Sequence, residues 1–217
     1  MDRTTVIDLI PRFIDYLDVV KGLSEKSVQN YGRFLTPFSR WLNDNGHSAL
    51  QPNQLTDELV YQYRVYLSRA AGAQGRGLKK STQNYYLIAL RALLAYFAQQ
   101  HLVSLPVERV ALSRQSRTRQ VKFLDLEKIK KLLEMPDVNT ERGLRDRAIL
   151  EVLFSTGMRV GELVGLNRDV LPSSRAPGGD RELAIVGKGG VARTVYLSPR
   201  SCEWVGRYLQ RRIDHDG

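Results

Sequence analysis

Apolar residues in the first half of the chain recur at the three- and four-residue spacing of amphipathic helices. The first such segment covers residues 5–17 and places its apolar side chains on one face: Val6, Ile10, Phe13, Ile14 and Leu17. Pro11 interrupts this segment, and proline is best tolerated in the first turn of a helix. The pattern therefore predicts an N-terminal helix whose first turn is marked by Pro11.

Three further helices are predicted before the middle of the chain. The second is capped at Ser24 and ends at residues 45–46, where an Asn-Gly pair can leave the helical conformation. The third begins near Thr56, and the fourth begins at Ser81 or Thr82. Four helices in about 110 residues predict a small helical bundle.

The composition changes after residue 112. Residues 113–120 contain no apolar side chain and three arginines, Arg114, Arg117 and Arg119. A segment of this kind between two helical patterns predicts an exposed basic linker between two domains, residues 1–112 and 121–217. The alternative is a solvated loop inside one domain.

The second half of the chain mixes helical and strand patterns. Helices are predicted over residues 125–133 and 145–154, and another begins near Val160 and extends to Leu166. Residues 182–186 and 192–197 have the apolar patterns of strands and flank a glycine-rich turn, which predicts a hairpin.

Two short segments complete this pattern. Asp169-Val170 is expected to begin an edge strand, and the chain returns to helix after Ser198. The predicted fold class is therefore mainly α with a small β-sheet.

Charge and composition narrow the classes of function. The 217 residues have a formal net charge of +10, and the pI is about 9.9. Such a charge indicates a polyanionic partner, most simply nucleic acid, and the alternative is a basic surface that only aids solubility. The single cysteine, Cys202, and three scattered histidines predict no internal disulfide and no metal site.

Membrane and export signals are also missing from the sequence. No apolar run approaches the roughly 20 residues that span a bilayer, and the first residues lack the layout of a secretory signal. The sequence is thus expected to be that of a cytoplasmic protein without a membrane contact.

Two local groups of residues have the chemistry of a phosphate site. In the first, a buried helix meets a turn at Gly157, and Arg159 lies at the start of the next helix. A guanidinium group matches phosphate oxygens and keeps its charge, and Glu162 could orient it or cap the helix. The alternative is a structural Arg–Glu surface pair.

In the second group, Lys188 occupies the glycine-rich hairpin turn, residues 187–190. A mobile hairpin could deliver this ammonium to a phosphodiester oxygen as a proton donor. The alternative is a solvated turn. A nucleotide-binding phosphate loop is disfavoured because the full Gly-x-x-x-x-Gly-Lys-Ser/Thr spacing is missing.

The order and spacing of these groups resemble a known family. Residues 156–166, Thr-Gly-Met-Arg-Val-Gly-Glu-Leu-Val-Gly-Leu, resemble the first arginine box of the tyrosine recombinases, the Xer and phage-integrase family. Residues 187–197 resemble that family's hairpin with its catalytic lysine. Residues 23–31 and 79–85 are similar to the starts of the second and fourth helices of its core-binding domain.

The resemblance implies both a fold and an activity. The fold would be a four-helix core-binding (SAM-like) domain followed by the N-terminal part of an α+β catalytic domain. In the family, a tyrosine attacks a DNA phosphodiester, forms a 3′-phosphotyrosyl link and releases a 5′-hydroxyl, without ATP, metal or another cofactor. By its match to the motif, Arg159 would neutralise transition-state charge and Lys188 would protonate the departing 5′ oxygen.

The resemblance also implies partners, namely double-stranded DNA and, for a full-length protein, other recombinase protomers in a synaptic tetramer. Candidate DNA contacts lie at two helix starts and in the linker. They are Lys26, Ser27, Tyr31, Lys79, Lys80, Ser81, Thr82, Asn84, Arg114, Arg117 and Arg119.

The sequence departs from the family after Lys188. It contains no His-x-x-Arg, and Tyr196 and Tyr208 are interpreted as a strand residue and a helix core residue, not as the nucleophile. The chain is therefore expected to be a truncated, DNA-binding fragment with half of the active site. The alternatives are a non-catalytic DNA-binding accessory protein of recombinase architecture, and a helical scaffold with a basic face.

Overall fold

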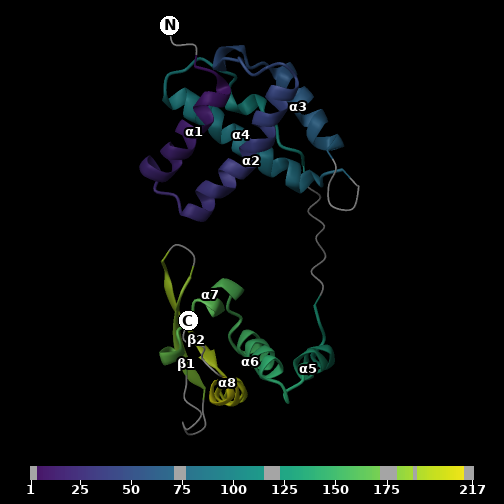
Figure 1. Cartoon of the computed structure of the whole chain (residues 1–217), viewed down its shortest axis with the longest axis vertical. Helices are drawn as coiled ribbons and strands as arrows, with labels where there is room; N and C mark the ends of the chain where they lie inside the picture. The colour runs from purple at the N-terminus through teal and green to yellow at the C-terminus, as the bar shows by residue number, and fades with distance from the viewer. Residues whose placement is uncertain (1–3, 71–76, 115–122, 172–179, 188–189, 213–217) are drawn as a thin grey trace. The chain divides into compact units, whose positions relative to one another are not determined.

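The computed structural model divides the chain into two compact units, residues 1–119 and 120–217, which are described separately (Figure 1). The structure describes residues 4–70, 77–114, 123–171, 180–187 and 190–212. Within these ranges the fold is mainly α with one two-stranded sheet, so the predicted fold class is confirmed. In the described residues no helix is both long and apolar enough to cross a membrane.

The first unit is a bundle of four α-helices around α4. Its α-helices are α1 (Val6–Asp15), α2 (Glu25–Asp44), α3 (Asp57–Arg69) and α4 (Lys80–Gln99). The π-helical turn η1 (Tyr16–Val20) lies between α1 and α2, the 3-10 turn η2 (Pro52–Gln54) lies between α2 and α3, and the 3-10 turn η4 (Val107–Arg109) follows α4. Helix α4 contacts all three other α-helices, so apolar residues are buried on several of its sides.

The expected role of Pro11 is wrong, because this residue lies inside α1 and not in its first turn. The helix begins earlier because Thr5 and Asp8 form a capping box: the Asp8 N–H donates to Thr5 Oγ1 at 3.1 Å, and the Thr5 N–H donates to Asp8 Oδ2 at 3.1 Å. Val6 and Leu9 are then buried in the core before the proline is reached. Cap and burial together offset the one backbone donor that proline lacks.

An aromatic cluster fills the centre of the first unit. The Tyr63 ring is completely buried, with centroids 4.9 Å from Phe38 and 5.5 Å from Trp41. Burial also raises the pKa of Tyr63, and its hydroxyl has no hydrogen-bond partner among the described residues. Position 63 is therefore held by apolar packing and not by a polar contact.

The second unit packs helices on a β-hairpin. It contains α5 (Leu126–Glu134), α6 (Glu141–Thr156), α7 (Val160–Val164), the 3-10 turn η5 (Arg168–Val170), β1 (Arg181–Val186), β2 (Ala192–Leu197) and α8 (Pro199–Arg211). The strands are antiparallel and run in register from the pair Arg181–Leu197 to the pair Val186–Ala192. Helix α6 packs against α8 and β2, and the core lies between them.

Three expectations for the second unit are corrected. Residues 168–170 form η5 and not the start of an edge strand, because the Leu171 N–H turns back to donate to the Arg168 carbonyl at 3.1 Å. Helix α7 ends at Val164, before Leu166, as Gly165 leaves the helical conformation. Helix α6 begins at Glu141, four residues earlier than predicted, because Thr140 caps it by accepting a bond from the Gly143 N–H at 3.0 Å.

A buried ion network joins the helices of the second unit. Arg147 and Glu151, one turn apart on α6, pair at 2.8 Å with side chains only 5% and 3% exposed. Arg147 also donates to the Leu133 carbonyl of α5 and lies 4.8 Å from the Trp204 ring centroid on α8. Arg200 of α8 donates to the same Glu151 carboxylate at 2.9 Å. The network thus links α5, α6 and α8.

Candidate functional site

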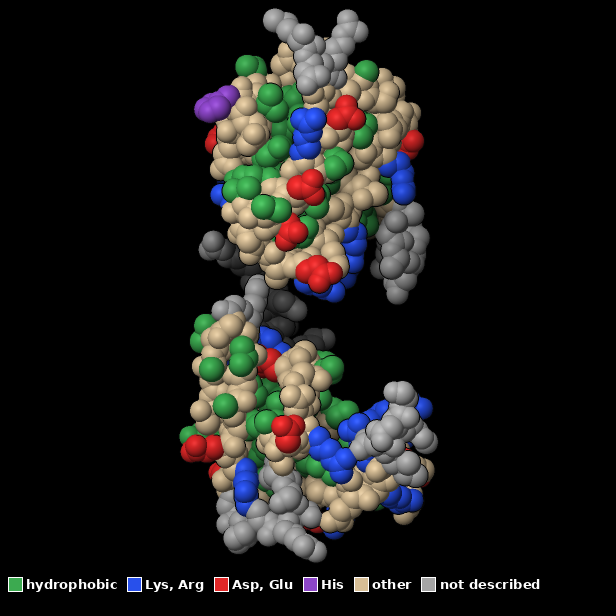
Figure 2. All heavy atoms as spheres, turned by 60° about the vertical axis from the view of Figure 1, so that its left-hand side comes forward, with side chains coloured by type: hydrophobic (Ala, Val, Ile, Leu, Met, Phe, Trp, Pro, Cys, Tyr) green, Lys and Arg blue, Asp and Glu red, His purple; other side chains and the backbone are tan. Residues whose placement is uncertain are grey.

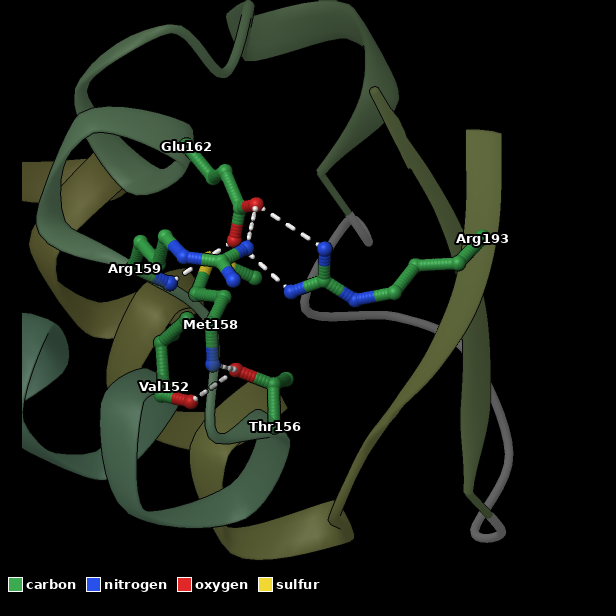
Figure 3. Close-up of polar contacts among 6 residues, drawn as sticks. All are labelled: Val152, Thr156, Met158, Arg159, Glu162 and Arg193. Carbon is green, nitrogen blue, oxygen red and sulfur yellow. Dashed lines mark hydrogen bonds and ion pairs between the residues drawn. The ribbon is translucent and has the colours of Figure 1, made fainter. Parts of the chain in front are cut away.

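The turn between α6 and α7 places Arg159 at the surface of the second unit. Gly157 has a φ of +62° and ends α6 by donating its N–H to the Leu153 carbonyl at 2.9 Å. Thr156 Oγ1 then accepts a bond from the Met158 N–H at 3.3 Å (Figure 3). Because Met158 is buried in the core, the turn is anchored and the next side chain, Arg159, points outward with 69% exposure.

Glu162 is the centre of the site. Its Oε2 accepts the Arg159 N–H at 2.8 Å, and its Oε1 accepts Arg159 Nη1 at 2.9 Å. The carboxylate therefore caps α7 and orients the guanidinium of Arg159 at once, the two roles that the sequence left as alternatives. Unlike Arg159, the Glu162 side chain is only 7% exposed.

Arg193 completes the group from the hairpin. It donates from both ends of its guanidinium to Glu162, Nη1 to Oε1 at 2.9 Å and Nη2 to Oε2 at 2.8 Å. Figure 3 shows Arg193 reaching across from its strand, so that Glu162 lies between two arginines that come from different elements. This geometry is the planar, two-pronged match between guanidinium and carboxylate.

Sequence reasoning did not select Arg193 as a site residue. It lies on β2 in the alternating positions of the buried Val195 and Leu197, on the face that packs on the core. An arginine in a core-facing position of a strand requires a buried partner, and this was the signal in the sequence.

Both arginines keep Glu162 ionised. The side chain of Arg193 and the backbone N–H of Arg159 lower the pKa of Glu162 from 4.5 to about 2. In turn, Glu162 raises the pKa of Arg193. The cluster therefore has fixed charges at neutral pH, two positive and one negative.

The predicted meeting of Arg159 and Lys188 stays a prediction, because Lys188 lies outside the described residues. Its neighbour Gly187 is described and lies beside the site. A Cβ added to Gly187 would be 3.0 Å from Arg193 Nη1 and 3.4 Å from Glu162 Oε1. The beginning of the hairpin turn is therefore close to the Glu162 carboxylate.

On the first unit, two of the three predicted contacts of α2, Ser27 and Tyr31, line a hollow of about 250 Å³. Lys26 is exposed, and Ser27 and Tyr31 are half-buried in the wall of the hollow. Residues of α4 form the opposite wall, including exposed Tyr85, which stacks on Phe34 with centroids 5.6 Å apart. Sequence reasoning missed Tyr85, although an aromatic residue on the polar side of a predicted helix could have marked it.

Four of the predicted contacts at the start of α4 are exposed or half-buried. Lys79, Lys80 and Ser81 are exposed and Thr82 is half-buried, and the helix itself begins at Lys80, one or two residues earlier than expected.

Asn84 is placed differently. Its side chain is buried, its Nδ2 donates to the Ser113 carbonyl and its Oδ1 accepts the Ser113 N–H, both at 2.9 Å. Both ends of the amide thus hold the chain at Ser113, and a DNA contact by Asn84 stays a prediction.

The basic residues of the linker are only partly described. Arg114 is exposed, while Arg117 and Arg119 lie outside the described residues. On the face of the first unit drawn in Figure 2, Lys and Arg side chains are interspersed with Asp and Glu. The positive charge therefore does not form one uninterrupted patch on that face.

Comparison with known proteins gives matches along both units. The family model described as "Phage integrase, N-terminal SAM-like domain" matches residues 10–101, and the one described as "Phage integrase family" matches residues 122–217. The chain is 31% identical to the tyrosine recombinase XerD of Lacticaseibacillus casei over 202 residues, and 31% identical to XerC of Myxococcus xanthus over 209 residues.

These alignments cover 93% and 96% of this chain but only 64% and 65% of the two relatives, so the chain spans slightly less than two thirds of their length. The XerH site-specific recombinase, solved bound to a palindromic difH substrate in a post-cleavage complex, shares the fold. It has a TM-score of 0.62 and 18% identity, over 97% of this chain and 60% of that one. The chain belongs to the phage integrase family, the tyrosine recombinases, and its relatives are of the Xer type.

Proposed function

We propose that the chain binds double-stranded DNA as part of a site-specific recombinase that cuts and rejoins DNA strands through a 3′-phosphotyrosyl intermediate. The observation that supports this most is the exposed guanidinium of Arg159, which is anchored by a buried turn and oriented by Glu162. A rigid, permanently charged donor on a core-anchored turn suits the stabilisation of charge on a phosphorus centre. The XerC and XerD relatives support the reaction class.

The roles of the two cations follow from the charge that develops during strand cleavage. When a tyrosine oxygen attacks phosphorus, the bond to the 5′ oxygen breaks, and negative charge grows on the non-bridging oxygens and on the leaving oxygen. Arg159 neutralises the first charge, and Lys188 gives its proton to the second. Removal of one such charge contact typically costs on the order of 3–4 kcal/mol of barrier.

DNA contact would come from both units. On the first unit the proposal keeps Lys26, Ser27 and Tyr31 together with residues 79–82, and in the linker it keeps the three arginines. The domain limits 1–112, 113–120 and 121–217 belong to the proposal. They are supported by the division of the chain into units after Arg119 and by the separate family matches.

The setting in which a full-length protein acts is proposed from the family. It would act in the cytoplasm, where other recombinase protomers assemble with it and DNA in a synaptic tetramer. Neither ATP nor a metal enters the reaction, since the phosphotyrosyl link conserves the energy of the broken bond.

The 217-residue chain is expected to bind DNA without cutting it, because no His-x-x-Arg occurs in its sequence. A mobility-shift assay with a labelled duplex at low salt tests the binding, and electrophoresis of the same samples in dodecyl sulfate tests for a covalent adduct. The expected result is a shifted band that dissociates completely in dodecyl sulfate. Absence of any shift would contradict DNA binding, and a resistant adduct that is lost on digestion of the protein would show that the chain cleaves by itself.

A further inference from the structure

The described charges around Arg159 do not pair one to one. Arg193 uses both Nη atoms on the two oxygens of Glu162, at 2.9 and 2.8 Å. Among the described residues, the guanidinium of Arg159 reaches only Glu162 Oε1, with Nη1 at 2.9 Å, and it remains largely exposed. The two guanidinium groups and the carboxylate thus sum to one positive charge, and the most exposed member of the group is Arg159, at 69% against 38% for Arg193.

We infer that Arg193 is a positioning residue that neutralises Glu162, so that Arg159 keeps a net positive charge and unused N–H groups for a DNA phosphate. The inference deepens the proposed function and rests on it. Arg193 does not itself contact the phosphate in this account, because the two ends of its guanidinium are directed at the carboxylate (Figure 3).

The burial of Glu162 is the reason that a neutralising partner is required. Its side chain is 7% exposed, and a buried carboxylate without a full ionic partner carries a large desolvation cost. If Arg193 were absent, the remaining described partner would be Arg159, whose charge Glu162 would then cancel. The guanidinium of Arg159 would turn inward onto both carboxylate oxygens and would present no net charge to DNA.

The packing beside Arg193 fits this role. Position 187 is a glycine, and a Cβ there would be 3.0 Å from Arg193 Nη1. The glycine thus leaves room for the guanidinium next to the carboxylate. Since Arg193 belongs to β2 and Glu162 to α7, the same ion pair also fixes the start of the hairpin turn against the helix that follows Arg159.

The test compares four variants of the full chain: Arg193→Gln, Arg193→Lys, Glu162→Gln and the double variant Glu162→Gln/Arg193→Gln. The control is Arg142→Gln, which removes the same charge from an 84% exposed arginine of the same unit. The measured quantity is the slope of log K against log[NaCl] for binding to a fluorescein-labelled duplex, because this slope falls by about 0.9 for each phosphate contact that is lost.

The expected result is a slope about 0.9 lower in magnitude for Arg193→Gln, and a slope like that of the unaltered chain for Arg142→Gln and Arg193→Lys. Glu162→Gln removes the carboxylate that orients Arg159, and it serves as the reference with which the double variant is compared. In the double variant the slope should return, since Arg159 no longer has a carboxylate to neutralise. A purely structural role for Arg193 predicts no such rescue.

The outcomes separate the inference from the function on which it rests. A double variant with the same lowered slope as Arg193→Gln overturns the inference alone, and so does an unchanged slope for Arg193→Gln. If the unaltered chain fails to bind duplex DNA, the proposed function is overturned and the inference falls with it.

Discussion

The carboxylate of Glu162 joins the start of α7 to strand β2. It receives the backbone N–H of Arg159, the side chain of Arg159 and the two-pronged guanidinium of Arg193. These partners favour the ionised carboxylate, which is why the pKa of Glu162 falls to about 2 in the folded chain. At the scale of residues, the arrangement of the Arg159 and Arg193 charges therefore depends on the single carboxylate of Glu162.

The pH dependence of stability follows from this pKa. Because the pKa of Glu162 is lower in the folded chain than its ordinary value of 4.5, the carboxylate stabilises the fold fully above about pH 4.5. This contribution is lost as the pH falls through about 2. Glu162→Gln should therefore lower the free energy of unfolding at pH 7, and the difference from the unaltered chain should shrink as the pH falls from 4.5 towards 2.

Urea unfolding followed by the fluorescence of Trp204, with Trp41→Phe in both proteins, reports on the second unit. A difference between the two proteins that stays constant from pH 7 to pH 2.5 would contradict the role of the Glu162 charge.

Local patterns in the sequence identify Arg159 as a site residue, but they do not identify Arg193. Arg159 was found because a glycine turn after a buried helix has a recognisable pattern, and the structure places it there. Arg193 and the use of Asn84 by Ser113 were missed. Both depend on partners that are 31 and 29 residues away in the chain, and such distant pairings leave no local periodicity.

At the scale of elements, local signals predicted most of the fold. The hairpin of β1 and β2, the helix starts after Thr56 and Ser198 and the turn at Gly157 all lie where the sequence indicated. The errors occurred where a competing interaction prevailed, as at Pro11, where a cap and buried neighbours extend α1, and at residues 168–170, where the chain closes a 3-10 turn.

The buried pair of α6 gives a prediction at this scale. Glu151→Ala would leave Arg147 buried without its carboxylate, so it should lower the free energy of unfolding of the second unit by about 3–5 kcal/mol. Glu203→Ala, which removes the partner of Arg207 in an exposed pair on α8, should cost about 0–1 kcal/mol. Urea unfolding measures both changes. Equal and small losses for the two variants would contradict the assignment of the network as a link between α5, α6 and α8.

At the scale of the whole molecule, the proposed DNA contacts lie on both compact units. The first unit offers exposed Lys79 and Lys80 at the start of α4, and the second offers Arg159. Neutralising both lysines (Lys79→Gln/Lys80→Gln) should therefore flatten the salt dependence of duplex binding by roughly 0.9 for each lost phosphate contact.

The matched control removes two positive charges from α5. Lys128→Gln/Lys130→Gln changes lysines that are already paired with carboxylates of their own segment, at 2.7 and 3.1 Å. Fluorescence anisotropy over a series of NaCl concentrations should give the control the slope of the unaltered chain. An equal flattening in both double variants would indicate an effect of net charge alone and would remove residues 79 and 80 from the interface.

The most direct test concerns the contact between Arg159 and a DNA phosphate. The slope of log K against log[NaCl] for duplex binding is measured for the unaltered chain and for Arg159→Gln, with Arg142→Gln as the control. We expect Arg159→Gln to lose about 0.9 of the slope while Arg142→Gln loses none. The same slope for all three proteins would contradict the claim that this guanidinium faces DNA.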